Sequence, residues 1–276
     1  MSNYLLIDVS YACFYRFYAN KTWFKFSHPE ETIEPNTDWT KNIQFMEKYE
    51  KIFDASILNL MDLYNISKEN VILAKDCSRK NIWRNKVYSE YKSTREASHI
   101  KSGFDGREVF KYTHDVLIPK WGYKCYSHPE LEADDIIANL VKQYSGNSIY
   151  ILASDHDYLQ LVDNNVTLID MKGKIKTCEN AHHELWKKIL MGDKSDNIPC
   201  CLINQKAIYP ERNERYIKCS NKVMSILFND WETWYSKIVN DNIIKDNSHL
   251  LNQNLIDFKY IPENLTSNIA EINFYL

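Results

Sequence analysis

The sequence lacks several features that would point to a simple functional class. Only six of its 276 residues are glycine and seven are proline, and no glycine-, serine- or proline-rich linker divides the chain. No uncharged apolar run approaches the roughly 20 residues that a membrane-spanning helix needs. The first segment has no basic leader, so we expect no signal peptide. These absences predict a protein with no membrane partner, built as one large domain or as a core with a small appendage.

A disulfide framework and an excess of positive charge are also missing. The seven cysteines follow no regular spacing, and adjacent Cys200 and Cys201 lack the spacer of a zinc knuckle. We therefore expect reduced thiols in an intracellular compartment, cytoplasmic or, in a eukaryotic or viral setting, nuclear. The net charge is −3, but nine acidic residues belong to the segments described next. Without them the rest of the chain is net basic, so nucleic acid is not excluded as a partner.

Acidic residues stand where a nuclease would hold metal ions. Three apolar runs, YLLID, VILAKD and SIYILASD, each end on a carboxylate, namely Asp8, Asp76 and Asp155. Such runs are typical of buried strands. The carboxyl ends of parallel strands meet at one edge of the sheet, so these three residues should converge. Clustered carboxylates repel one another, and a bound divalent cation would remove the repulsion.

Three further segments concentrate acidic residues. EADD has three carboxylates within four residues at a helix start, where one cap is enough. SDHD is expected to direct two aspartates to one side of an extended segment, and GDKSDN to place two on one face of a helical turn. Oxygen-only ligands select Mg²⁺ or Mn²⁺ over zinc, and two such ions support in-line phosphoryl displacement. Unrelated helix caps are the alternative interpretation. The residues concerned are Glu132, Asp134, Asp135, Asp155, Asp157, Asp193 and Asp196.

A basic region, RKNIWRNKVYSEYKSTRE, follows the second of these strands. If it is helical, Arg84, Tyr88, Tyr91 and Arg95 share one stripe, with Lys92 beside it. A stripe of cations and aromatic rings suits a phosphate backbone and a stacked base. The alternative is a solvated basic face with buried tyrosines.

Alternating strand and helix patterns predict an α/β fold, with a mainly parallel sheet covered by helices on both faces. Residues 20–40 read as a loop, and the chain after residue 196 reads as helical and irregular. The expected strands are residues 4–8, 70–76, 122–126, 148–154 and 166–169, and the expected helices are about 10–19, 42–64, 106–118 and 133–144.

Together these segments resemble the 5′-nuclease, or flap endonuclease, family, which includes phage 5′-3′ exonucleases and the 5′-nuclease domains of bacterial DNA polymerases. LEADD, SDHDYLQL and GDKSDNIP carry the resemblance most specifically, and RNKVYSEYKSTR is similar to the family's arginine and Tyr-Lys-x-x-Arg pattern. The resemblance implies a PIN-like α/β nuclease core over residues 1–190, with a helical arch at about 79–105. It also implies a C-terminal helical DNA-binding region, of helix–three-turn–helix type, over 191–276.

The resemblance further implies two Mg²⁺ ions, for which Mn²⁺ could substitute. One ion would belong to Asp8, Asp76, Glu132, Asp134 and Asp135, and the other to Asp155, Asp157, Asp193 and Asp196. Arg84 and Lys92 would act on the scissile phosphate. The expected nucleic-acid contacts, from the resemblance or from charge, are Arg16, Lys80, Tyr88, Tyr91, Arg95, Lys206, Arg212, Arg215 and Lys218.

The sequence departs from the family directly after GDKSDNIP. The family has a glycine-rich hairpin there, which grips duplex phosphates through backbone N–H groups and a monovalent cation, whereas this chain has CCLINQKAIYPERN, with no glycine. Without glycine the backbone cannot adopt positive φ cheaply. We therefore expect cationic side chains to bind the duplex, with a differently spaced hairpin as the alternative.

The function that the resemblance implies is structure-selective cleavage of DNA at a 5′ end, flap or nick, with an RNA–DNA hybrid as a second substrate. Such a nuclease would act in DNA replication or repair, with replication proteins as partners. One alternative is a PIN-like single-strand RNA nuclease, a class that needs fewer carboxylates. A non-catalytic DNA-binding relative is the other, which the loss of a metal ligand would favour. Every expected acidic residue is present.

Overall fold

The computed structural model describes residues 1–34, 37–95, 104–201 and 248–272. The chain forms two compact units. The first comprises Met1–Ile82, Glu96–Thr177 and Pro262–Leu276, and the second comprises Trp83–Arg95 and Cys178–Ile261. The expected domain division after residue 190 stays a prediction.

A seven-stranded sheet, in the order β6-β5-β4-β1-β2-β3-β7, forms the centre of the first unit. The inner pairs β5–β4, β4–β1, β1–β2 and β2–β3 are parallel, and β6 and β7 are antiparallel additions at the two edges. The predicted mainly parallel α/β fold is therefore confirmed. The strands are β1 Asn3–Asp8, β2 Val71–Ala74, β3 Lys124–Ser127, β4 Ser148–Leu152, β5 Val166–Ile169, β6 Ile175–Lys176 and β7 Ala270–Glu271.

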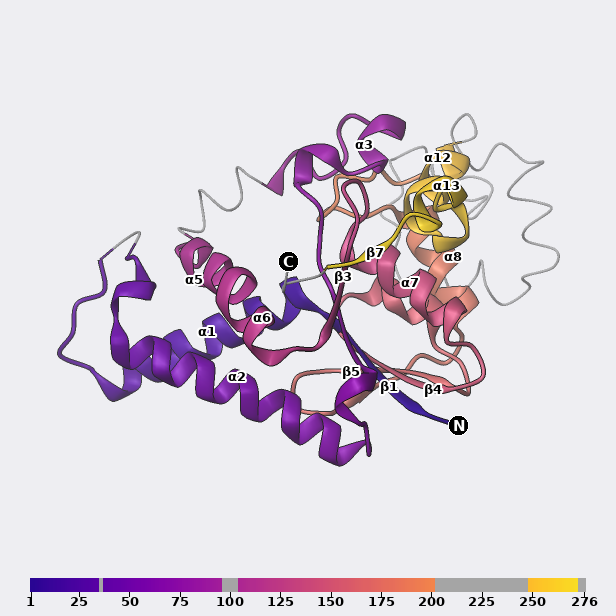
Figure 1. The fold of residues 1–276 in the computed structure, drawn as a ribbon. Coiled ribbons are helices and arrows are strands. Elements are labelled where there is room, and N and C mark those ends of the chain that lie inside the picture. The colour runs from indigo at the N-terminus through magenta and orange to yellow at the C-terminus, as the bar shows by residue number, and fades with distance from the viewer. Residues whose placement is uncertain (35–36, 96–103, 202–247, 273–276) are drawn as a thin grey trace. The chain divides into compact units, whose positions relative to one another are not determined.

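Helices cover both faces of this sheet, which explains why β2 is buried at every position and β1 at its apolar centre. Leu5 and Ile7 of β1 belong to the core that helices α1 and α2 help to form, whereas Leu6 between them is buried on the opposite face. Helix α7 lies across that opposite face, on the other side of the sheet from α1 and α2 (Figure 1). The helices of this unit are α1 Val9–Ser27, α2 Ile43–Leu63, α5 Arg107–Tyr112, α6 Ile118–Trp121, α7 Ala133–Gln143 and α13 Glu263–Thr266.

Helix α1 is much longer than the sequence predicted. It continues to Ser27 through a segment that was expected to be a loop. The extension is held by packing, because Phe24 is buried against Trp39 and Phe45. The predicted helix before β3 is instead interrupted by one π-helical turn, Thr113–Leu117, and ends where Gly122 adopts a φ of 64°. Helix α2 begins close to the expected position, and its cap is Asn42, whose side chain accepts the Phe45 N–H.

The second unit is helical in its described part. It contains α3 Arg84–Val87, α8 Ala181–Met191 and α12 Ser248–Ile256, and α12 packs against both of the others. The side chain of Asn252 fixes α12 by donating to the carbonyl groups of Ile189 and Pro199, at 2.9 and 2.8 Å. The greater part of the expected DNA-binding region, with Lys206, Arg212, Arg215, Lys218 and the glycine-free segment, lies outside the described residues.

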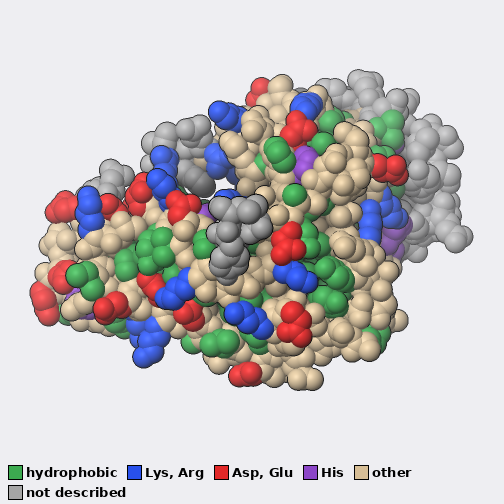
Figure 2. Space-filling model, viewed as in Figure 1, with side chains coloured by type: hydrophobic (Ala, Val, Ile, Leu, Met, Phe, Trp, Pro, Cys, Tyr) green, Lys and Arg blue, Asp and Glu red, His purple; other side chains and the backbone are tan. Residues whose placement is uncertain are grey.

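The described surface mixes the two signs of charge. On the face seen in Figure 2, acidic and basic side chains are interspersed. None of the helices in the described ranges has the length and apolar character that membrane crossing requires. Within the same ranges the structure has six cysteines and no disulfide between them.

Candidate metal centre and basic segment

Asp8 lies at the carboxyl end of β1, where the strand passes directly into α1. Its carboxylate caps that helix, because Oδ1 accepts the backbone N–H of Tyr11 at 2.9 Å. The other oxygen, Oδ2, accepts a hydrogen bond from the hydroxyl of Tyr158, also at 2.9 Å. Both oxygens are therefore oriented by protein donors from two different elements.

Asp76 lies two residues beyond β2, which pairs with β1 in parallel. Its Oδ1 accepts the backbone N–H of Ala133, at the start of α7, at 2.8 Å. Its Oδ2 accepts a hydrogen bond from the hydroxyl of Ser10 on α1. Asp76 thus connects the beginnings of the two helices that cover opposite faces of the sheet.

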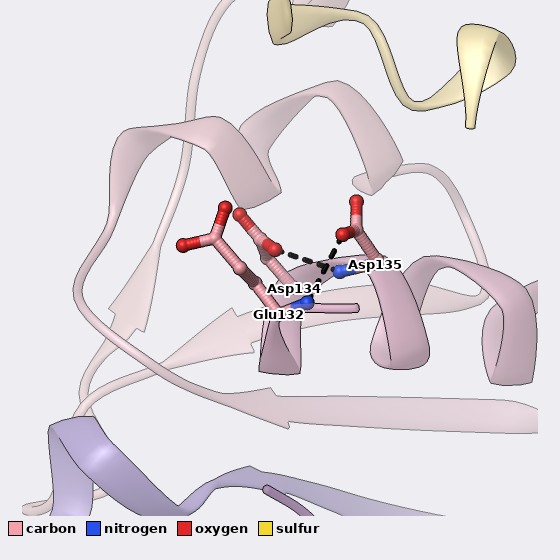
Figure 3. A group of neighbouring side chains, drawn as sticks. All are labelled: Glu132, Asp134 and Asp135. Carbon is pink, nitrogen blue, oxygen red and sulfur yellow. Dashed lines mark hydrogen bonds between the residues drawn. The ribbon is translucent and has the colours of Figure 1, made fainter. Parts of the chain in front are cut away.

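The first turn of α7 brings three carboxylates together (Figure 3). Asp135 Oδ2 accepts the backbone N–H of Glu132 at 3.1 Å, and Asp134 Oδ1 accepts the N–H of Asp135 at 2.8 Å. Figure 3 shows the carboxylates of Glu132 and Asp134 extending side by side from the helix start. One oxygen from each of the three residues lies within 4.8 Å of the others, a spacing at which they could hold a metal ion.

The pKa of Asp8 is raised by its surroundings. Burial, together with the charges of Asp76 and Asp155, raises the pKa from 3.8 to about 7, although the hydrogen bonds from Tyr11 and Tyr158 oppose the shift. Parallel pairing of β1 with β2 and with β4 places the three aspartates at or beyond the carboxyl ends of neighbouring strands. A divalent cation among them would favour the charged form.

The SDHD segment differs from the prediction in its backbone. Asp155 caps a 3₁₀ helix, His156–Leu161, by accepting the N–H of Asp157 at 3.0 Å. The expected extended segment was wrong, because this short-range cap stabilises a helical turn. Tyr158, next in the chain, has its side chain fully buried beneath the turn.

Asp193 and Asp196, in the second unit, lie on a tight turn and not on the predicted helical one. The turn is closed by reciprocal backbone hydrogen bonds between Asp193 and Ile198, of 2.9 and 2.7 Å. Burial would raise the pKa of Asp193, but the ion pair with Lys188 at 2.8 Å and the hydrogen bonds from Ser195 lower it to about 2.

Asp196 is buried, and residues of the basic region that belong to the same unit, Trp83–Arg95, bind it. Lys92 Nζ lies 3.5 Å from its carboxylate, Arg95 forms an ion pair with it, and the hydroxyl of Tyr91 donates to it at 3.3 Å. The backbone N–H of Lys92 also donates to the Asp196 carbonyl, at 2.8 Å. The charges of the basic segment therefore satisfy an acidic residue of their own unit.

The predicted helical stripe through the basic segment was wrong. Helix α3 ends at Val87, Tyr88 is extended, and Lys92 has a φ of 54°. Arg84 is 1% exposed and donates from Nε to the Leu255 carbonyl at 2.7 Å, so tertiary contacts override the helical spacing. The roles of Arg84 and Lys92 on the scissile phosphate stay predictions.

Two other expected contacts lie in the first unit. Arg16, on α1, is partly buried, with its guanidinium 5.1 Å from the Tyr15 ring centre. Lys80 is exposed in a 3₁₀ turn, Arg79–Asn81. The sequence interpretation missed Tyr158 and Ser10. Their closeness in sequence to Asp157 and Asp8 was the available signal, but a hydroxyl near an aspartate is too common to single out.

A parallel α/β sheet with carboxylates gathered beyond its strand ends is an arrangement that could hold a divalent cation. A family model described as "5'-3' exonuclease, N-terminal resolvase-like domain" matches residues 3–188. The chain therefore belongs to the 5′-3′ exonuclease family.

Known relatives agree with this assignment. The chain is 28% identical over 235 residues to a protein named ribonuclease H from Enterobacteria phage T4, covering 81% of this chain and 75% of the phage protein. It is 33% identical over 146 residues to a 5′-3′ exonuclease of Buchnera aphidicola from Schizaphis graminum, covering 49% of each.

Solved structures share the fold. The D15 flap endonuclease of bacteriophage T5, in a complex with DNA and metal ions, has a TM-score of 0.58 and 16% identity. The match covers 96% of this chain and 95% of that one. The T5 5′-exonuclease with bound zinc has a TM-score of 0.57 and 14% identity, and the match covers 96% of each chain.

Proposed function

We propose that this nuclease hydrolyses DNA phosphodiesters near a 5′ end, flap or nick, and that it requires Mg²⁺, with Mn²⁺ as a substitute. The observation that carries the proposal is the clustering of carboxylates from Asp8, Asp76 and the first turn of α7 at the carboxyl ends of the strands. The chain's membership in the 5′-3′ exonuclease family supports it. The T5 relative is titled a flap endonuclease and was crystallised with DNA and metal ions, which supports DNA as the substrate class.

The donor set fits a hard divalent cation. Glu132, Asp134 and Asp135 offer only carboxylate oxygens, close enough together for one ion, and Asp8 and Asp76 add more at the neighbouring strand ends. When bound, divalent ions would supply the positive charge that activates a water and stabilises the leaving oxygen in an in-line displacement. The chain's own contribution is to fix these carboxylates through helix caps and hydroxyl donors.

A second divalent ion is part of the same proposal, on the family resemblance. RNA annealed to DNA is included as a substrate because the T4 relative is named a ribonuclease H. A role in replication or repair follows from the same relatives and stays a proposal.

Cleavage assays on matched substrates test the proposal. Flapped, nicked and single-stranded DNA, an RNA–DNA hybrid and single-stranded RNA are compared in Mg²⁺, Mn²⁺ and EDTA. We expect metal-dependent products from the 5′ side of the branched DNA and none from Asp134→Asn. Asp62→Asn, an exposed aspartate on α2, is the control and should cleave like the wild type. Cleavage of single-stranded RNA alone would favour the PIN-like alternative, and DNA binding without cleavage would favour a non-catalytic relative.

A further inference from the structure

Two hydroxyl groups make hydrogen bonds to the candidate metal-binding aspartates of the first unit. Tyr158 donates to Asp8 Oδ2 at 2.9 Å, and Ser10 donates to Asp76 Oδ2. The remaining oxygen of each aspartate accepts a backbone N–H at a helix start, that of Tyr11 for Asp8 and that of Ala133 for Asp76. Each carboxylate is therefore held at both oxygens.

The Tyr158 side chain is rigidly placed for this task. Its relative exposure is 0%, so the surrounding core fixes its ring as well as its hydroxyl. It belongs to the 3₁₀ helix that Asp155 caps, whereas Asp8 ends β1. Parallel pairing of β1 with β4 brings the chain ends that carry these residues to the same sheet edge. One phenol thus connects the SDHD turn to the β1–α1 junction.

A hydrogen bond to a carboxylate affects metal binding through orientation. A carboxylate oxygen has two lone pairs, so an oxygen that accepts one hydrogen bond can still coordinate a cation. The hydrogen bond fixes the rotation of the carboxylate, and loss of such an outer partner typically weakens metal affinity or activity by about 10–100-fold. Without the two hydroxyl groups, only one backbone N–H would hold each carboxylate against the repulsion of its charged neighbours.

We propose that Tyr158 and Ser10 are positioning residues, which hold Asp8 and Asp76 in the orientation that binds a divalent cation. The inference rests on the proposed function, since it assigns these aspartates to the metal. A purely structural role for Tyr158, satisfying its own buried hydroxyl, would affect folding but not the affinity for metal. The two roles are therefore separable by experiment.

The test is direct titration of the DNA-free protein with Mn²⁺, followed by calorimetry or by the electron paramagnetic resonance of free Mn²⁺. We expect Tyr158→Phe and Ser10→Ala each to weaken binding by about 10-fold or more. Tyr49→Phe is the matched control: Tyr49 is equally buried, and its hydroxyl hydrogen-bonds Thr113 Oγ1 at 2.9 Å, outside the acidic cluster. Its Mn²⁺ affinity should equal that of the wild type.

Thermal unfolding of each variant is measured in EDTA to establish that it is folded. Mn²⁺ affinities are compared only between folded proteins. Wild-type affinity in either folded variant would overturn the role of its hydroxyl, and Ser10→Ala keeps the idea testable should Tyr158→Phe not fold. The Mg²⁺ concentration for half-maximal cleavage should rise by the same factor as the Mn²⁺ dissociation constant. Failure of the wild type itself to bind Mn²⁺ would refute the proposed metal site, a result distinct from equal binding by wild type and variants.

Discussion

Replacing Asp8 by asparagine should stabilise the metal-free protein, and should do so mainly at neutral and alkaline pH. Burial and the charge of Asp76 raise the pKa of Asp8 from 3.8 to about 7 in the folded protein. Between these values the folded state binds a proton that the unfolded chain has released, so the free energy of unfolding falls as pH rises. Each pKa unit of the shift corresponds to about 1.4 kcal/mol. Above pH 7 the free energy of unfolding of the wild type is therefore lower by up to about 4 kcal/mol than at acidic pH. Asparagine carries no charge and is still an effective helix cap.

Urea unfolding in EDTA measures this effect at two pH values. The free energy of unfolding of Asp8→Asn should exceed that of the wild type by about 3 kcal/mol more at pH 8 than at pH 4.5. Asp62→Asn, on an exposed position, should show no such difference. Saturating Mg²⁺ should narrow this difference at pH 8, because a ligand at 100 times its dissociation constant stabilises the wild type by about 2.7 kcal/mol and Asp8→Asn has lost a ligand. An equal change in stability at both pH values would refute the claim that burial and neighbouring charges raise the pKa of Asp8.

Four other substitutions have equally definite outcomes. Asp76→Ala should reduce cleavage of a flap substrate to the level seen in EDTA while leaving DNA binding in Ca²⁺ within twofold, and full activity at saturating Mg²⁺ would contradict the metal assignment. Asp105→Ala should lower the free energy of unfolding by about 3 kcal/mol in a urea titration, because it leaves Lys21 without a partly buried ion pair of 2.7 Å and also removes the acceptor of the Trp39 N–H. Gly192→Ala should cost more than about 3 kcal/mol, since φ is +69° and a Cβ atom would lie 2.3 Å from the Ile198 carbonyl oxygen. Gly146→Ala, with φ of +85° and nothing within 4 Å, should cost only about 1–2 kcal/mol; equal losses at both glycines would show that the close approach to Ile198 has no effect.

The parallel sheet and the location of its acidic edge were predictable from the sequence. Apolar runs that end on Asp8, Asp76 and Asp155 are local patterns, and a strand buried on both faces needs such a run whatever surrounds it. The helix start at EADD was equally predictable, because helix capping depends on residues only three positions apart. These features survive in the structure because short-range chemistry and the repeating geometry of a parallel sheet are sufficient to fix them.

The conformation of the basic region and the hydrogen bonds of the hydroxyl groups at the acidic edge depend on tertiary contacts. The spacing of Arg84, Tyr88 and Tyr91 fits a helical stripe, but the contacts of Arg84 with Leu255 and of Lys92 with Asp196 join residues more than 100 positions apart and break the helix. No local pattern encodes such contacts. The hydrogen bond from Tyr158 to Asp8 spans 150 positions in the same way, so its presence became evident only when the strands had brought the two residues together.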